Sequence, residues 1–263
     1  MFSGSERAMF IAADWPAPAH VHACVSTRQG GCSAAPRDSL NLAQHVGDDP
    51  AAVARNRAIL ASALGLPAEP AWLDQVHGCA VVEARPDGIV RRGDAAHTSA
   101  PGVVCAVMTA DCLPVLLTDR AGTQVAAVHC GWRGLAAGVL AAAVARFGCP
   151  GTELIAWLGP AISQRAFEVG PEVREAFLAP CRHEAARGAV RAAFLPGCDG
   201  APRYHADLYA LARIALAALG VNRVYGGGFC TFGSPQLFYS YRRDGVTGRM
   251  ASLIWISHGP GDA

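Results

Sequence analysis

The sequence predicts a mixed α/β fold for this chain of 263 residues. Apolar runs such as 102–109 and 124–129 have the length and the β-branched content of buried strands. Between such runs lie Ala/Leu-rich stretches, such as the one that reaches about residue 146, which are typical of helices. No apolar run attains the roughly 18 residues of a membrane span. We therefore expect a soluble protein in which strands and helices alternate.

The first part of the chain predicts two strands and a helix. An apolar stretch ends near residue 26 before a Gly-Gly turn, which places Arg28 where a strand meets a loop. The acidic pair before Pro50 predicts the start of a helix over 51–64, and Gly65 marks its end. Residues 71–77 alternate apolar and polar side chains, which predicts a strand that stops at Gly78.

The later part predicts further strands, two helices and a hairpin. Strands are expected over 102–109, 113–117, 124–129 and 154–158. Helices are expected from Pro171 and over 207–219, where Gly220 follows. Residues 236–242 and 250–256 predict a final hairpin around the turn 244–248. Neither a repeat nor a linker interrupts the pattern, so we expect one domain over 1–263.

Composition excludes several classes of function. The net charge is +1 and there are no long runs of like charge, so the sequence predicts no basic surface for binding nucleic acid. All basic side chains are arginine, which excludes Schiff-base chemistry through lysine. The apolar stretch 9–13 is too short for a secretory signal, so we expect a cytoplasmic protein without membrane contact. The ten cysteines contain no Cys-x-x-Cys pair, which argues against a disulfide framework.

Three side chains suit a metal ion. His77 and His129 come at predicted strand ends before glycine-containing turns, and Cys112 follows a buried strand. Three Cys and His ligands with a fourth position open are typical of a catalytic zinc site. Their spacing matches no short metal-binding motif, so the alternative that they are ordinary core residues stays open at this point.

Several motifs resemble one known family over nearly the whole chain. They are Gln75-Val76-His77-Gly78, Thr109-Ala110-Asp111-Cys112-Leu113-Pro114-Val115, His129-Cys130-Gly131-Trp132-Arg133-Gly134, Asn41-Leu42, His45-Val46-Gly47-Asp48-Asp49-Pro50, Gly159-Pro160, Phe167-Glu168-Val169-Gly170, Phe238-Tyr239-Ser240-Tyr241-Arg242-Arg243 and Thr247-Gly248-Arg249. The sequence is similar to the bacterial YfiH family, once labelled laccase-domain or multicopper polyphenol oxidase and also called the peptidoglycan editing factor family. The resemblance implies a layered sandwich in which helices flank a mixed β-sheet.

The resemblance also implies an activity. It makes His77, Cys112 and His129 zinc ligands of an enzyme that phosphorolyses adenosine, inosine or methylthioadenosine to the free base and ribose 1-phosphate and also deaminates adenosine. The expected partners are a purine nucleoside and phosphate, in a monomer or homodimer. Two departures from the family pattern are Cys130, where alanine is usual, and His97, at a normally apolar position.

Other residues are candidates for catalysis. Asp111 adjoins Cys112, so it is expected to act as an acid or base, or to orient a histidine ligand. Cys112 and Arg133 complete the candidate catalytic set. The aromatic candidates for stacking on a base are Trp132, Phe167 and Phe229.

Substrate binding is expected to depend on arginine, because phosphate needs a cation and the chain has no lysine. Arg28, Arg133 and Arg242 are the candidates, since each lies in a glycine-rich or motif-bearing turn. Asn41 joins Arg28 and Arg242 as a candidate substrate-binding residue.

Three alternatives remain. The first is a copper oxidase, although Met108 would lie roughly 13 Å from Cys112 on an extended strand, too far to be an axial ligand. The second is a hydrolase with Cys112 as nucleophile and His77 or His129 as base. The third is a protein that binds or edits cell-wall precursors.

Overall fold

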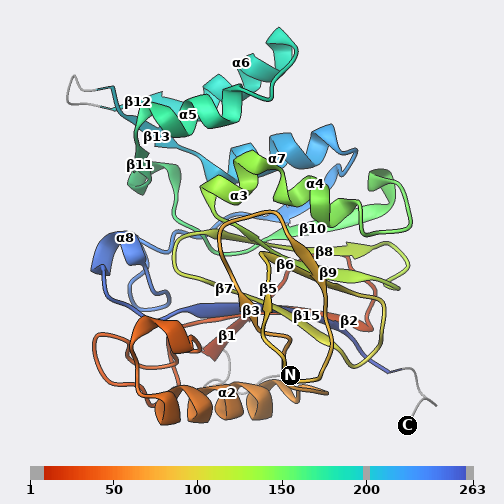
Figure 1. Ribbon diagram of the computed structural model, residues 1–263, viewed down its shortest axis with the longest axis vertical. Coiled ribbons are helices and arrows are strands. Elements are labelled where there is room, and N and C mark those ends of the chain that lie inside the picture. The colour runs from red at the N-terminus through yellow and green to blue at the C-terminus, as the bar shows by residue number, and fades with distance from the viewer. Residues whose placement is uncertain (1–8, 198–201, 259–263) are drawn as a thin grey trace.

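The computed structural model describes residues 9–197 and 202–258 and has four layers (Figure 1). Two β-sheets lie face to face. Helix α2 (Pro50–Leu64) covers the outer face of one sheet, and helices α3 (Trp132–Ala137), α4 (Val139–Val144) and α7 (Leu208–Ala218) cover the outer face of the other. The prediction of a mixed α/β fold is confirmed.

The two main sheets are built from strands that are distant in the sequence. The six-stranded sheet has the order β14 (Arg223–Gly226), β10 (Leu154–Leu158), β8 (Leu113–Asp119), β9 (Val125–Cys130), β6 (Ala95–Thr98) and β4 (Val81–Glu83). The four-stranded sheet has the order β1 (Phe10–Ala12), β2 (Val21–Ser26), β15 (Met250–Ile256) and β7 (Val104–Thr109). Two small sheets contain β11 (Glu168–Val169), β13 (Tyr204–Ala206) and β12 (Phe194–Pro196), and β3 (Leu73–Asp74) with β5 (Arg91–Arg92).

The helices are mostly short. They are α2 (Pro50–Leu64), α3 (Trp132–Ala137), α4 (Val139–Val144), α5 (Pro171–Leu178), α6 (Glu184–Ala192), α7 (Leu208–Ala218) and α8 (Tyr241–Asp244), with 3-10 turns η1 (Gln44–Val46), η2 (Gly151–Glu153) and η3 (Gln164–Ala166). None of those within 9–197 and 202–258 is long and apolar enough to span a bilayer.

The central strands are apolar throughout because both of their faces are covered. Along β7, Val107 packs between the two sheets, whereas Ala106 packs beneath α2. This alternation follows from the period of two in a strand. The outer face of the six-stranded sheet packs against the helices, since Val128 of β9 and Leu140 of α4 belong to one buried apolar cluster. Runs without polar residues were therefore the correct signal for strands.

The predicted helices are confirmed with small changes. The carboxylate of Asp49 accepts a hydrogen bond from Ala51 N at the start of α2, and Gly65 ends this helix in the left-handed region at φ 58°. The Ala/Leu-rich stretch forms two helices, because the chain adopts φ 96° at Gly138 between α3 and α4. Helices α5 and α7 begin where the sequence predicts them.

The predicted hairpin of 236–242 with 250–256 is wrong. Residues 241–244 form helix α8, in which Ser240 Oγ accepts a hydrogen bond from Arg243 N. Strand β15 pairs instead with β2 and β7, where it is buried on both faces. The strand predicted over 71–77 is reduced to Leu73–Asp74, because the N–H groups of residues 76–78 bond to a side chain rather than to a strand.

Asn56 of α2 fixes the loop that precedes this helix. Its Oδ1 accepts a hydrogen bond from Cys32 N at 2.8 Å. Its Nδ2 donates to Ser33 Oγ, Ser39 O and Asn41 O at 2.8, 3.1 and 2.8 Å. The side chain is fully buried, so its amide group depends on these hydrogen bonds in place of bonds to water.

We expect Asn56→Ala to lower the free energy of unfolding by about 2–4 kcal/mol, because it leaves several buried polar groups unpaired. Urea denaturation measures this loss. The control is Asn222→Ala, at an exposed position, which is expected to change stability by less than about 0.5 kcal/mol. Equal effects of the two substitutions would contradict the anchoring role of Asn56.

Candidate metal centre

The structure brings His77, Cys112 and His129 together. Their potential ligand atoms lie within 4.8 Å of one another, so the three side chains could hold a metal ion. Cys112 Sγ is 3.8 Å from His77 Nε2, and the two imidazole rings meet edge to face with centroids 4.7 Å apart. His129 is buried, Cys112 partly exposed and His77 exposed, so the group opens to solvent on one side.

Antiparallel pairing explains why these residues meet. His129 lies near the end of β9 and Cys112 immediately precedes β8, and these strands pair with Leu113 opposite Cys130. The end of one strand therefore lies beside the start of the other. His77 reaches the same place from the segment after β3.

Asp94 holds two of the three side chains in position. Its Oδ1 is 2.8 Å from His129 Nδ1 and accepts a hydrogen bond from His77 N at 2.8 Å. Its Oδ2 accepts from Gly78 N at 2.6 Å and from Val76 N at 3.3 Å. Because an ionised carboxylate can only accept, His129 donates through Nδ1, and Nε2 is the nitrogen left to face Cys112 or a bound metal. Burial alone would raise the pKa of Asp94. The hydrogen bonds from His129 and Gly78 lower it by more, so the pKa lies below its ordinary value.

Backbone strain is concentrated at this group. Among the non-glycine residues within 9–197 and 202–258, His77 and Asp111 have positive φ, at 60° and 94°. Residues with a Cβ rarely adopt a positive φ, and non-glycine residues that do so are often found at functional sites. The three N–H bonds to Asp94 account for the conformation at His77.

The thiol and the buried imidazole are electrostatically paired. Burial raises the pKa of Cys112, but His129 and then His77 lower it by more, so that it falls to about 6. Burial lowers the pKa of His129, but Cys112 and Asp94 raise it to about 9. A thiolate beside an imidazole is the arrangement that a divalent cation also favours.

The three side chains open into a cleft of about 360 Å³. The other lining residues are His45, Gln75, Met108, Thr109, Ala110, Tyr241 and Arg249. The size lies within the range of small-molecule sites. Gln75 is fixed by a reciprocal pair of bonds, from its Nε2 to Met108 O at 2.9 Å and from Met108 N to its Oε1 at 2.7 Å.

Asp111 does not belong to the residues that line this cleft. Its Oδ1 accepts a hydrogen bond from Thr231 Oγ1 at 2.6 Å, and its Oδ2 accepts from Arg242 N at 2.7 Å. Both oxygens thus tie the segment before Cys112 to the segment that carries Tyr241. Asp111 was a candidate for orienting a histidine ligand. In the structure, Asp94 makes that contact, with His129.

The predicted anion-binding and substrate-binding residues lie outside the cleft lining. Arg28 pairs with Asp38 at 3.2 Å and donates to Pro235 O at 3.1 Å. Arg133 lies over the ring of Trp132, and Arg242 Nη1 donates to Glu168 O at 2.8 Å. Asn41 is fully buried, and its Oδ1 accepts from Arg249 N at 3.0 Å.

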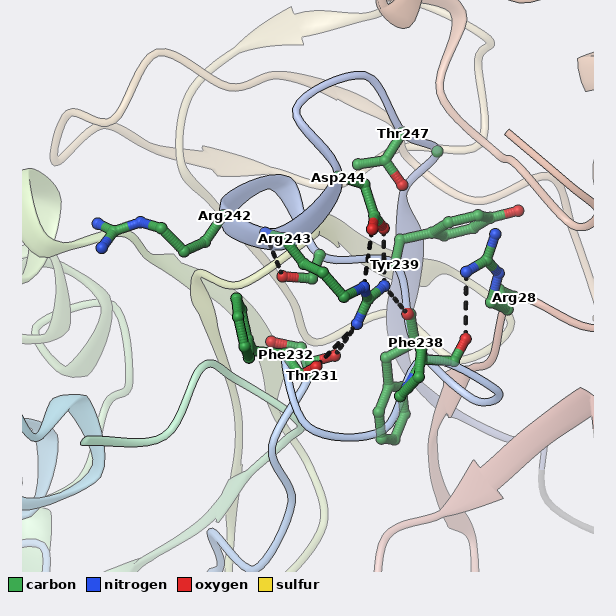
Figure 2. A network of polar contacts seen from close by, with 12 residues as sticks. Arg28, Thr231, Phe232, Phe238, Tyr239, Arg242, Arg243, Asp244 and Thr247 are labelled. Atoms are coloured by element: carbon green, nitrogen blue, oxygen red, sulfur yellow. Dashed lines mark hydrogen bonds and ion pairs between the residues drawn. The ribbon is translucent and has the colours of Figure 1, made fainter. Parts of the chain in front are cut away.

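Arg243 holds the segment beside the cleft together (Figure 2). Its Nη1 donates to Thr231 O at 2.8 Å and Phe232 O at 3.0 Å, and its Nη2 donates to Phe238 O at 3.0 Å. The same guanidinium forms a two-pronged pair with Asp244. Figure 2 shows the side chain of Arg242 extending away from this cluster. Arg243 therefore has its donors occupied within the protein.

Several residues of the site were missed from the sequence. Asp94 precedes a strand without any recognisable motif. Tyr241 and Arg249 belong to motifs of the family resemblance, but no role was predicted for either of them. Tyr241 is 60% exposed at the cleft, whereas the aromatic candidate Phe167 is buried and Phe229 packs on Phe238. The signal that could have found Arg249 is the glycine before it, which marks a close backbone approach.

Met108 and Cys112 both line the cleft, with the end of β7 and the turn at Asp111 between them. That Met108 is too distant from Cys112 to be an axial ligand stays a prediction. The side chain of Met108 is 6% exposed and packs in the cluster beneath α2. The pair His20 and His22 lies elsewhere, since His22 stacks on Trp255 and His20 contacts Gly122 O.

Comparison with known proteins identifies the family. A family model described as multi-copper polyphenol oxidoreductase laccase matches residues 22–257. An Escherichia coli K12 protein named purine nucleoside phosphorylase YfiH is 52% identical over 94% of this chain and 98% of its own length. This chain belongs to the YfiH family. A Pseudomonas aeruginosa protein, also named a purine nucleoside phosphorylase, is 58% identical over 94% of this chain and 98% of its own.

Solved structures agree with the YfiH assignment. A Neisseria meningitidis protein of the DUF152 family superposes with a TM-score of 0.87 at 51% identity, over 95% of this chain and all of that chain. The Bacillus licheniformis YfiH structure gives a TM-score of 0.82 at 29% identity, over 90% and 93% of the two chains.

We expect Asp94→Asn to weaken metal binding by about 10-fold to 100-fold, because the amide cannot accept at both atoms and His129 loses its orienting partner. Competition with a chromophoric chelator measures the affinity for zinc. The control Asp87→Asn removes an exposed carboxylate that pairs with Arg91 and is expected to leave the affinity unchanged. Wild-type affinity in Asp94→Asn, with its fold verified by circular dichroism, would refute the role of Asp94.

Proposed function

We propose that this chain is a zinc-dependent purine nucleoside phosphorylase. The observation that carries the proposal is the convergence of His77, Cys112 and His129 at one cleft, which has an exposed aromatic ring and a cation in its lining. The names of the YfiH relatives support the same reaction. Adenosine deamination at the same site is part of the proposal, as a second activity.

The residues present fit a zinc ion. One thiolate and two imidazoles are borderline-soft donors of the kind that catalytic zinc uses, with a position left open. Tetrahedral zinc with these ligands sets sulfur and nitrogen roughly 3.5 Å apart, close to the 3.8 Å between Cys112 and His77. A Cβ on Gly131 would lie 2.6 Å from His77 Cδ2 and 3.2 Å from Cys112 Sγ, so glycine keeps the space beside the donors free.

His77, Cys112 and His129 would hold the ion, which when bound supplies Lewis acidity to a ligand in its open position. Asp94 keeps His129 in the tautomer that presents Nε2. The two hydrogen bonds to Met108 fix Gln75 in the lining of the same cleft. These residues orient the reactants without themselves changing partners.

Phosphorolysis requires that an oxygen of phosphate attack C1′ of the ribose while the bond from C1′ to the purine nitrogen breaks. The electron pair of that bond passes to the purine, which takes up a proton. An exposed aromatic ring favours the purine by stacking. Tyr241, at the cleft and 60% exposed, is the residue that we propose for this contact.

The test of this function is chromatographic analysis of adenosine and inosine incubated with zinc-loaded protein, with and without phosphate. We expect free base and ribose 1-phosphate in equal amounts when phosphate is present. We also expect inosine to form from adenosine. Oxidation of a phenol by copper-loaded protein would instead support the oxidase named in the family description. Hydrolysis by metal-free protein would support Cys112 as a nucleophile.

We expect Cys112→Ala to lose stoichiometric zinc and to reduce phosphorolysis by at least 100-fold, while the far-ultraviolet circular dichroism spectrum stays unchanged. The reason is that Cys112 is partly exposed at the end of a sheet and does not support the core. Cys149→Ala, another partly exposed cysteine, is the matched control and is expected to keep zinc and activity. A Cys112→Ala protein with full zinc content would contradict the proposed ligand set.

A further inference from the structure

Within residues 9–197 and 202–258, Arg249 is the one arginine that lines the cleft. It is partly buried. Its Nη1 donates to Thr247 O at 3.1 Å and to Gly248 O at 3.0 Å. Among the described residues, no carboxylate lies within ion-pair distance of this guanidinium. Its charge at the cleft is therefore not neutralised by a direct ion pair.

The backbone of Arg249 is rigidly placed. Its N–H donates to Asn41 Oδ1 at 3.0 Å, and Asn41 is itself held by Asp48 and Ala43. A Cβ on Gly248 would lie 2.7 Å from the Tyr239 ring and 3.0 Å from Asn41 Cβ. Only glycine allows this approach, so the residue before Arg249 fixes where the arginine enters the cleft. A cation positioned in advance binds an anion at a lower entropic cost.

A second polar group lies in the same lining. Thr109 is 2% exposed, and its Oγ1 has no hydrogen-bond partner among the described residues. It ends β7 and pairs with Met250, the residue after Arg249. Buried hydroxyls are normally bonded, and this one keeps its donor for a further partner.

We infer that Arg249, with the hydroxyl of Thr109, forms the subsite for inorganic phosphate. The inference rests on the proposed function and identifies where in the cleft its second substrate binds. A guanidinium forms two parallel hydrogen bonds with phosphate oxygens, and the threonine hydroxyl donates a further one. Arg249 thereby holds the phosphate beside the three proposed metal ligands, which line the same cleft. The rival cations Arg28 and Arg242 donate to protein carbonyls outside the lining.

The test is calorimetric titration of zinc-loaded protein with inorganic phosphate, which requires no turnover. Arg249→Gln is expected to weaken phosphate binding at least tenfold, and Arg249→Lys to recover part of the loss through its charge. The control Arg146→Gln, at an exposed site, is expected to stay within twofold of the wild type. Zinc content and circular dichroism verify that each variant is loaded and folded.

Steady-state kinetics separate this inference from the proposed function. We expect Arg249→Gln to raise the KM for phosphate at least tenfold and the KM for inosine less than threefold. If the wild-type protein binds phosphate through Arg249 but does not phosphorolyse nucleosides, the phosphate subsite is supported and the proposed function is refuted. Turnover with unchanged phosphate affinity in Arg249→Gln, or an equal rise in the KM for phosphate and the KM for inosine, would overturn the subsite.

Discussion

The buried carboxylate of Asp94 is the constraint on which the site depends. It is fully buried, and an ion in such a place is costly unless each lone pair is bonded. His129 Nδ1 and the N–H groups of Val76, His77 and Gly78 provide those bonds. The carboxylate thereby sets the orientation of one imidazole and the strained backbone of the other. One side chain, Asp94, thus fixes two of the three proposed ligands, although it does not itself line the cleft.

A second set of contacts joins the segment of the remaining ligand, Cys112, to the segment that carries Tyr241. Asp111, beside Cys112, accepts hydrogen bonds from Thr231 and from the backbone of Arg242. Arg243 then closes the segment 231–244 on itself through three carbonyls and Asp244. Because Tyr241 belongs to this segment, the aromatic wall is held at a fixed place relative to Cys112. The site is therefore rigid on both sides, as positioning of two substrates requires.

The sequence predicts most of the fold, because strands covered on both faces are apolar throughout and helix ends carry caps, as at Asp49 and Gly65. It failed for the hairpin at 236–256, where β15 pairs with strands more than 100 residues away and local turn signals mislead. At the site, His77, Cys112 and His129 were found from residue type and motif. Asp94 and Arg249 were missed as site residues, because their roles follow from three-dimensional neighbours and not from spacing. The roles of Asp111 and Asn41 as anchors likewise needed the partners of their side chains.

We propose that one zinc ion is bound by His77, His129 and Cys112 at the end of the paired sheets. X-ray absorption spectroscopy of the purified, metal-loaded protein tests this ligand set, because the absorption edge identifies the element and the fine structure identifies the neighbouring atoms. We expect a zinc edge with one sulfur at about 2.3 Å and two nitrogens at about 2.0–2.1 Å. A copper edge at full occupancy, or a zinc shell without sulfur, would contradict it.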